Sequence, residues 1–389
     1  MNRPGVAVVG IGRTAYSTDS GVSTATLAAD ASRAALVDSG LRPADVDGFC
    51  SFHVNDSTPA LAVAHAIGID DLAWCVDGLG GGNLAAAVVA GAAAAIDAGL
   101  CTTAVVFRAL NGRSGRRFGR AGASTAGGTR PAMRVPGEAQ FGAPHGYLVP
   151  PQWMAVWAQR HQAVHGSTCE DLGQIAITQR AHAARNDHAV AREPLTMDRY
   201  LDSRWINEPL RVFDCAFEVD GAAALVLTTL DRARDLAQPP VRILSAADAQ
   251  ANGGSWDQWP DQTSMFSKLL APRLWGRAGI GPADIDVACI YDCFTYTVMA
   301  VMEDLGFFPK GGAGKFFGSG AATYGGSVVV NPHGGLLSEG YIHGMNHHYE
   351  AVLQLRGQGG ARQVPDASVA LVTAGAGPYG GAVLYEGTP

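Results

Sequence analysis

The strongest constraint on the fold is a short motif that the chain contains twice. Pro-Ala-Asp-Val-Asp occupies residues 43–47, and Pro-Ala-Asp-Ile-Asp occupies residues 282–286. Each copy follows an alanine-bearing helical segment and precedes an apolar run of strand length, and Cys50 and Cys289 stand at matching offsets after it. Repeated sequence in a repeated context indicates an internal duplication of β-α-β-α-β units.

The order of the expected elements repeats as well. The first half is expected to contain a strand, a glycine-rich turn, a helix and a strand, at residues 72–76, 78–82, 83–98 and 102–107. The second half is expected to contain the same series at residues 327–330, 331–335, about 345–355 and 368–373. Alternating strands and helices favour parallel-rich sheets that are covered by helices.

The chain therefore divides into two expected halves, 1–240 and 241–389, with an excursion of loops and helices at about 109–210 in the first half. A chain of 389 residues is too long for one simple core, which agrees with a large duplicated unit. The excursion begins with a stretch rich in glycine, arginine and proline and continues into three segments with helical spacing.

Composition excludes several classes of protein. A net charge of −7 argues against general nucleic-acid binding. The longest uncharged apolar run, residues 85–96, is too short for a membrane span, and the first residues lead into an apolar strand without a signal peptide. Seven scattered cysteines without a Cys-x-x-Cys pair indicate reduced thiols. We expect a cytoplasmic protein without a disulfide framework or a metal site.

Two stretches in the second half resemble the signatures of a known family. Ile-Tyr-Asp-Cys-Phe stands at 290–294, and Asn-Pro-His-Gly-Gly at 331–335 precedes Gly-Tyr-Ile-His-Gly at 340–344. They resemble the His-Asp-Cys-Phe and Asn-Pro-x-Gly-Gly…Gly-His-Pro-x-Gly motifs of sterol carrier protein x-type thiolases. The resemblance covers nearly the whole chain and implies the thiolase fold: α/β, two duplicated halves in five layers (αβαβα), usually as a homodimer.

Four catalytic positions of that family differ here. Tyr291 and Tyr341 replace the two histidines, the helix that begins near Gly82 has no nucleophilic cysteine, and alanine stands near the place of the last family cysteine. Cys75 lies a few residues too early, inside a predicted strand, where cysteine usually acts as a small hydrophobic residue. These exchanges argue against thiolysis and leave an acyl-CoA pocket plausible.

Within this superfamily the chain is most similar to the steroid side-chain aldolases of actinobacterial sterol catabolism. These lyases cleave a 17-hydroxy steroid carboxyl-CoA into a 17-ketosteroid and propanoyl-CoA by a retro-aldol reaction. The resemblance implies that Tyr291 and Tyr341 are the catalytic acid–base pair. A phenol titrates near pH 10 and can serve as base or proton donor when its surroundings adjust its pKa. Which tyrosine is the base stays open at this point.

The resemblance also implies supporting residues. Asn331 is expected to hold a water or the thioester oxygen, with His333 in the same turn. Asp292 is expected to orient Tyr291 or to cap the following helix. The backbone of Gly377 or Gly375 is expected to form part of an oxyanion hole.

The CoA moiety is expected to contact the glycine-rich turn at Gly80, Gly81 and Gly82, and also Arg116 and Arg117. The two arginines belong to an arginine-rich segment, residues 108–134, which is suited to the 3′-phosphate of CoA, to an acidic partner or to solvent. No cofactor beyond the CoA thioester itself is expected.

Other chemistries have weaker support. A Schiff-base lysine needs a ketone or aldehyde donor, and a thioester cannot form that intermediate. His343 and His347 have a spacing that can bind zinc on a helix, but no adjacent glutamate completes the motif. Two other functions stay open: a thiolase-type acyltransferase, and a non-catalytic subunit that binds acyl-CoA or lipid. The related aldolases imply a separate partner subunit with an OB-fold and a zinc ribbon, associated with an acyl-CoA hydratase.

Overall fold

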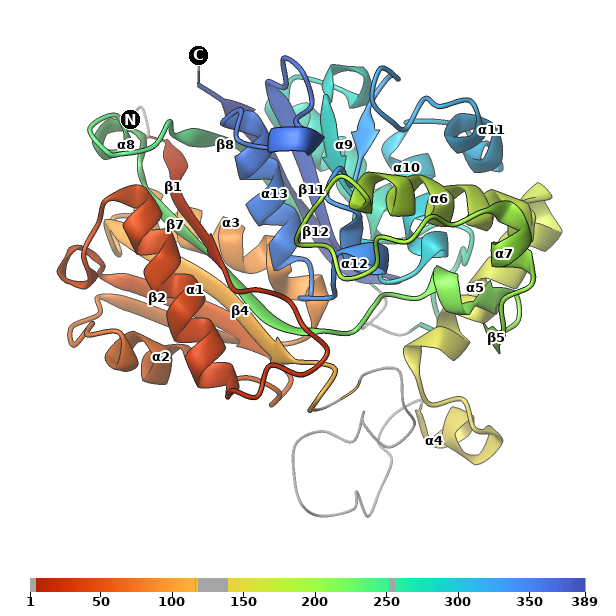
Figure 1. Cartoon of the computed structure of the whole chain (residues 1–389), viewed down its shortest axis with the longest axis horizontal. Helices are drawn as coiled ribbons and strands as arrows, with labels where there is room; N and C mark the ends of the chain where they lie inside the picture. Colours follow the sequence, from red (N-terminus) through yellow and green to blue (C-terminus); the bar gives the residue numbers. More distant parts are fainter. Residues whose placement is uncertain (1–4, 116, 118–138, 252–255, 389) are drawn as a thin grey trace.

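The computed structural model describes residues 5–115, 117, 139–251 and 256–388 (Figure 1). Its described strands form one ten-stranded sheet and a separate two-stranded sheet. The first half of the large sheet contains β1 (Val6–Arg13), β2 (Gly48–His53), β3 (Trp74–Leu79), β4 (Thr103–Asn111) and β7 (Asp220–Thr229). The second half contains β8 (Val241–Gln250), β9 (Val287–Cys289), β10 (Val329–Val330), β11 (Val369–Ala376) and β12 (Tyr379–Gly387).

The strand order confirms the duplication. From the outer edge inwards, the first half reads β3-β2-β4-β7-β1 and the second half reads β10-β9-β11-β12-β8. In each half the three outer strands are parallel and the two inner strands antiparallel, and β1 pairs with β8 at the centre. The sheet is thus mixed and less parallel than the sequence led us to expect. β8 begins at Val241, and the division of the chain at 240/241 stays a prediction.

The helices complete five layers. α3 (Ala85–Asp97) and α13 (Met345–Leu355) contact strands of both halves and therefore lie between them (Figure 1). The outer faces are covered by α1 (Thr24–Ser39) and α2 (Ala60–Ala66) on the first half, and by α9 (Phe266–Ala278) and α10 (Thr295–Leu305) on the second.

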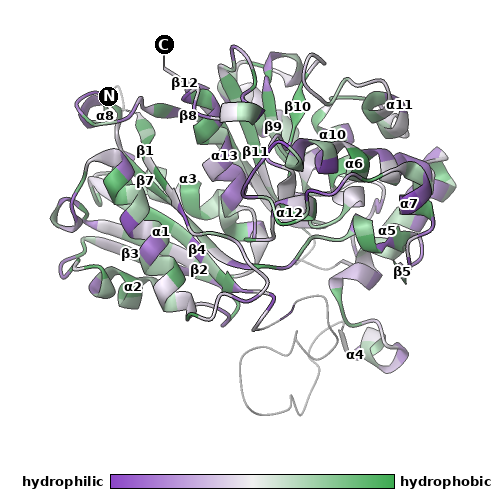
Figure 2. Cartoon of the chain, viewed as in Figure 1, coloured by the Kyte–Doolittle hydropathy of each residue, from purple (hydrophilic) through white to green (hydrophobic). Residues whose placement is uncertain are grey.

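Composition explains which helices are central. α3 consists almost entirely of alanine, valine and other apolar residues on all sides, which is typical of a helix buried in a core (Figure 2). α1 instead buries one face and exposes Asp30 and Arg33 on the other. Its ends follow its sequence: the Ser23 hydroxyl accepts a hydrogen bond from the Thr26 amide, and Gly40 closes the helix at φ 75°.

The excursion lies between β4 and β7 in the chain and packs mainly against the second half. It contains α4 (Ala139–Gly142), α5 (Pro150–His165), α6 (Cys169–Ala183), α7 (Met197–Leu201), β5 (Trp205–Asn207) and β6 (Leu210–Arg211). α5 and α6 contact α10, and α6 also contacts α11 (Ala313–Gly318) and α12 (Gly335–Ser338). The remaining short helix, α8 (Leu230–Ala233), connects β7 to β8.

None of the described helices combines the length and the apolar composition that a membrane crossing requires. Within the described ranges, no three histidine, cysteine, aspartate or glutamate side chains converge in a way that could hold a metal ion.

Candidate active site

A cavity of about 1220 Å³ lies where the excursion meets the loops that follow β3, β9 and β11. One wall contains Tyr291, Tyr341 and His343, and Gly81 and Gly82 lie beside them. The remaining described lining is largely apolar and includes Trp153, Met154, Trp256, Phe294 and Tyr379. Cavities with apolar walls and a few converging polar groups are the usual sites of small-molecule binding.

The two tyrosines meet at their hydroxyl groups. Tyr291 Oη lies 3.0 Å from Tyr341 Oη, a hydrogen-bond distance, and the ring planes are inclined by 63°. Tyr291 is anchored by its amide, which donates to Thr373 Oγ1, and Tyr341 is anchored by its amide, which donates to the Phe217 carbonyl. Loops from two distant parts of the chain thus bring two phenols into contact on the cavity wall.

Residue 82, at the start of the helical turn that leads into α3, has no room for a side chain. A Cβ atom on Gly82 would lie 1.8 Å from Tyr291 Oη. The Tyr291 hydroxyl therefore occupies the space that a side chain at residue 82 would need.

Behind Tyr341 lies a buried network that the sequence analysis did not find. Arg108 donates from Nη2 to Asp56 Oδ2 at 2.6 Å. It also donates to His343 Nδ1, from Nε at 3.2 Å and from Nη2 at 3.1 Å. The His343 ring lies 4.9 Å from the Tyr341 ring, centroid to centroid. The only signal in the sequence is a charged residue, Arg108, inside the apolar strand β4, because a buried charge needs a partner.

The surroundings fix the charge of these groups. Burial, helped by the positive charge of Arg108, lowers the pKa of His343 to about 3. His343 is therefore neutral, and because Nδ1 accepts from Arg108 the ring proton resides on Nε2. Burial raises the pKa of both tyrosines well above 10. For Tyr341 the hydrogen bond with Tyr291 and the charge of Arg108 act in the opposite direction.

Three residues expected to support the tyrosines are fully buried and do not line the cavity. Asn331 holds the amide and the carbonyl of Ile290, at 2.8 and 3.0 Å, so its side chain is not directed at a substrate oxygen. Asp292 accepts from the Leu336 and Leu337 amides at the start of α12, and not from Tyr291. His333 Nε2 lies 2.9 Å from His347 Nδ1. These side chains hold the loops that carry the tyrosines.

Some of the expected glycine and arginine positions line the cavity, and others do not. Gly81 and Gly82 line the cavity, but Gly80 does not. Gly375 and Ala376 line it in place of Gly377, where a Cβ atom would lie 2.4 Å from the Trp256 ring. Arg117 lies at the cavity with its Nε bonded to Glu218 Oε2 at 2.5 Å, whereas Arg116 falls outside the described residues.

The remaining candidates for catalysis do not form reactive groups. Cys75 is exposed on β3 and away from the cavity lining. Cys293 lines the cavity, but burial raises the pKa of its thiol to about 12, so it stays protonated. His343 and His347 do not form a metal pair, because His343 faces the cavity and His347 lies beside Asp292. No lysine is among the described lining residues.

Comparison with known proteins first defines the class. Residues 249–384 match the thiolase C-terminal domain-like family model. Human mitochondrial 3-ketoacyl-CoA thiolase aligns over 99% of both chains with a TM-score of 0.72 at 16% identity, which shows the same fold. The molecule is a thiolase-fold protein with two tyrosines at its centre.

The particular family follows from nearer relatives. A 17-hydroxy-3-oxo-4-pregnene-20-carboxyl-CoA lyase of Mycobacterium tuberculosis is 41% identical, over 97% of this chain and 98% of its own. The solved Ltp2-ChsH2(DUF35) aldolase aligns over 99% of this chain and 98% of its own, with a TM-score of 0.89 and 36% identity. The chain belongs to the steroid side-chain-cleaving aldolases.

Proposed function

We propose that this protein is a carbon–carbon lyase that cleaves a β-hydroxyacyl-CoA by a retro-aldol reaction. The proposed substrate is a 17-hydroxy steroid side-chain CoA thioester, and the products are a 17-ketosteroid and propanoyl-CoA. The observation that carries the proposal is the contact of the Tyr291 and Tyr341 hydroxyl groups, 3.0 Å apart, on the cavity wall beside Gly82.

We assign Tyr341 as the base and Tyr291 as the proton donor. Tyr341 is the tyrosine beside His343 and Arg108, so its phenolate would gain most from the buried positive charge. The reacting form carries Tyr341 as the phenolate, which takes the proton of the substrate hydroxyl, while the bond between the α and β carbons breaks and the electron pair passes to the thioester enolate. Tyr291 then protonates the α carbon, and the proton on Tyr341 returns to Tyr291 through their hydrogen bond.

The enolate oxygen needs donors that are fixed in advance. We propose that it faces the backbone at Gly81 and Gly82, where the helical segment that leads into α3 begins. The first amides of a helix have no partner within it and favour negative charge. The steroid rings are proposed to lie against the apolar wall around Trp153 and Trp256.

Removal of either phenol tests this function. Tyr291→Phe and Tyr341→Phe should each lower the rate of propanoyl-CoA release by about 10²–10⁴-fold, the usual loss for one general acid or base. Tyr324→Phe removes a partly buried hydroxyl that donates to the Arg362 carbonyl outside the cavity, and serves as the matched control. Near-normal cleavage by both folded variants would overturn the two-phenol mechanism.

The two alternatives predict different results. An acyltransferase would lose activity with iodoacetamide, whereas the lyase should be insensitive because Cys293 is a protonated thiol. A non-catalytic subunit would bind acyl-CoA without releasing a ketone.

We further propose that the protein acts as a homodimer with a separate subunit containing an OB-fold and a zinc ribbon. The name of the related Ltp2-ChsH2(DUF35) aldolase pairs two components and supports a two-component complex. β3 forms an outer edge of the sheet with Val76 41% and Leu79 77% exposed, and such edges favour pairing with another chain. Light scattering of the protein alone and with the co-expressed subunit tests both interactions, and full activity of the lone chain would contradict the need for a partner.

A further inference from the structure

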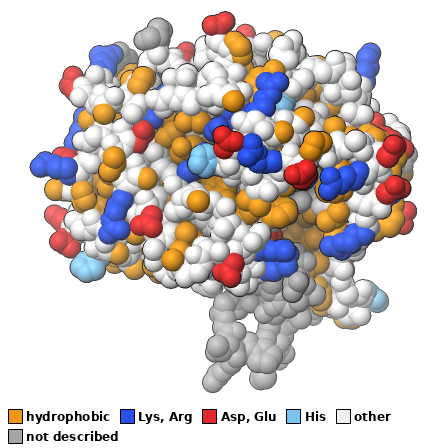
Figure 3. Space-filling view, in the orientation of Figure 1, with side chains coloured by type: hydrophobic (Ala, Val, Ile, Leu, Met, Phe, Trp, Pro, Cys, Tyr) orange, Lys and Arg blue, Asp and Glu red, His pale blue; other side chains and the backbone are white. Residues whose placement is uncertain are grey.

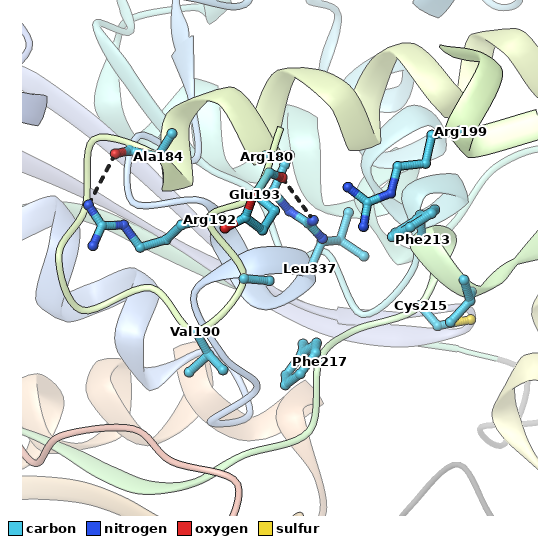
Figure 4. A pocket seen from close by; sticks show the side chains of 12 residues that line it. Arg180, Ala184, Val190, Arg192, Glu193, Arg199, Phe213, Cys215, Phe217 and Leu337 are labelled. Carbon is cyan, nitrogen blue, oxygen red and sulfur yellow. Dashed lines mark hydrogen bonds between the residues drawn. The ribbon is translucent and has the colours of Figure 1, made fainter. Parts of the chain in front are cut away.

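A second cavity lies on the face of the molecule shown in Figure 1, away from the two tyrosines. It has a volume of about 680 Å³ and lies between α6, residues 190–193, the start of α7 and α12. Val212, Cys215 and Phe217 line both cavities, so the segment 212–217 separates them (Figure 4). Basic side chains lie on this part of the surface in Figure 3, with acidic side chains among them. Nothing in the proposed reaction uses this cavity.

Two arginines dominate the second cavity. The Arg180 and Arg199 guanidinium groups lie 5.6 and 5.7 Å from the centre of the same Phe213 ring (Figure 4). Arg180 is only 7% exposed and donates to Ser338 Oγ and to the Glu193 carbonyl, and Arg199 donates to the Pro194 carbonyl. Each of these partners is neutral.

The charges of these arginines are not balanced locally. Within the described part of the chain, no carboxylate lies within 4.0 Å of either guanidinium group. Burial, and then the charge of Arg199, lowers the pKa of Arg180, so the two cations disfavour each other. An unpaired buried charge is costly, and a bound anion would offset that cost.

The rest of the lining defines the kind of anion. Arg192 stands at the rim paired with Asp187 at 2.8 Å, and the Glu193 side chain also lines the cavity. Val190, Phe217 and Leu337 add further apolar parts to the lining. The volume far exceeds the roughly 30 Å³ that one water occupies in the liquid, so the cavity has room for an organic ligand. A ligand with an anionic head and an apolar or aromatic body would fit.

We propose that this cavity binds an organic phosphate of nucleotide size, with its phosphate between Arg180 and Arg199 and its apolar body against Phe213 and Phe217. A phosphate carries up to two charges and several acceptor oxygens, so it can bond to two guanidinium groups at once, whereas a carboxylate balances one. The phosphate belongs either to the 3′-phospho-ADP end of a CoA thioester or to a free nucleotide.

Calorimetry on the full chain tests the site without any turnover, and so independently of the proposed reaction. Adenosine 3′,5′-bisphosphate at low salt should bind to the wild-type protein, and adenosine should not. Arg199→Ala, which removes an exposed side chain, should weaken binding at least tenfold, as expected for the loss of a charged hydrogen bond. Arg180→Met should do the same if its thermal unfolding stays near that of the wild type.

Arg33→Ala is the matched control, because Arg33 is an exposed arginine on the outer helix α1. It should leave the bisphosphate affinity unchanged. Equal affinity of the wild type and Arg199→Ala, or no bisphosphate binding at millimolar concentration, would overturn the site. Loss of binding to an acidic partner peptide in Arg199→Ala, without any bisphosphate binding, would also overturn it and assign the surface to a protein.

Two further measurements distinguish the sources of the phosphate. If the cavity holds the end of CoA, Arg199→Ala should raise KM for a CoA thioester severalfold and leave KM for the matching pantetheine thioester unchanged. If it holds a free nucleotide, both KM values should equal those of the wild type while bisphosphate binding is still lost. Either result supports an organic phosphate site.

Discussion

At the scale of single residues, one buried cation distinguishes two otherwise similar tyrosines. Both phenols are buried and both have pKa values raised by that burial. Of the two tyrosines, Tyr341 makes an edge-to-face contact with His343, which Arg108 holds through Nδ1. The field of Arg108 therefore favours negative charge on Tyr341 over negative charge on Tyr291. The pair is asymmetric before any substrate binds.

This asymmetry predicts the effect of removing Arg108. Loss of the single side chain would leave Asp56 as an unpaired buried charge and destabilise the fold, so the double variant Arg108→Gln/Asp56→Asn is the informative one. Its kcat should fall about tenfold or more, because a rise of one pKa unit in Tyr341 corresponds to a tenfold change. The acidic limb of the pH–rate profile, which reports the pKa of the base, should move to higher pH. An unchanged profile in a folded double variant would exclude a role for the cation.

At the scale of elements, α3 and the short helical turn before it set the space around the phenols. Gly82 and Gly91 lie in the same helical stretch but differ in their surroundings. A Cβ atom at residue 82 would overlap Tyr291, whereas one at residue 91 would meet no atom within 4 Å.

The two glycines give a paired prediction. Gly82→Ala should lose most of its activity and about 1–3 kcal/mol of stability, because the Tyr291 ring has to move. Gly91→Ala should keep its activity and be neutral or more stable by about 0.5–1 kcal/mol, because alanine favours the helix. Activity assays and urea unfolding of the two variants check this. A fully active Gly82→Ala protein would show that the ring is not confined as described.

Buried histidines make the helices α6 and α13 sensitive to acid. Burial lowers the pKa of His182 in α6 to about 4 and that of His348 in α13 to about 3. The unfolded chain binds these protons near pH 6.5, whereas the folded chain stays neutral until far lower pH. The unfolded state therefore binds more protons between pH 6.5 and about 4, and the free energy of unfolding falls as the pH falls.

The prediction is a decline in stability between pH 7.5 and pH 5. Each histidine should contribute at most about 1.4 kcal/mol per pH unit below its unfolded pKa. His348→Gln should make the free energy of unfolding less dependent on pH by the contribution of His348, because glutamine does not titrate. Urea unfolding curves at several pH values measure this slope. An equal slope in the variant would show that His348 does not hold its depressed pKa.

At the scale of the whole molecule, the two halves share one core. A single cluster of buried side chains contains Val8, Cys50 and Leu225 from the first half together with Cys289, Val372 and Val383 from the second. α3 and α13 supply the middle of that cluster. Neither half can bury these helices alone.

The shared core predicts a single cooperative unfolding transition despite the duplication. Circular dichroism and the fluorescence of a reporter tryptophan in the first half, Trp74, should follow the same denaturation curve as the tryptophans of α5 and α9. Variants that each keep one tryptophan assign the fluorescence change to one part of the molecule. Two separate transitions would show that the halves are independent domains.

The sequence predicted individual helices and strands better than it predicted the relative direction of the strands. The helix expected at about 345–355 is α13, Met345–Leu355, because its apolar spacing is local in the sequence. β8 and β12 were not predicted, because they are defined by pairing with each other across more than a hundred residues. Their antiparallel pairing, together with that of β7 with β1 and β4, makes the sheet less parallel than expected.

The candidate site shows the same limit. Tyr291 and Asp292 are neighbours, but at the end of a strand successive side chains point to opposite sides, so one faces the cavity and the other faces α12. The motif therefore identified the region but not which of its residues face the cavity. The network of Arg108 could not be predicted, since its partners lie 52 and 235 residues away in the chain.

The close approach of residue 82 to Tyr291 also limits how the active site can be engineered. Any residue with a Cβ atom at position 82 would collide with the phenol unless the Tyr291 ring is displaced. A design that places a new side chain at this position therefore needs a second substitution at residue 291.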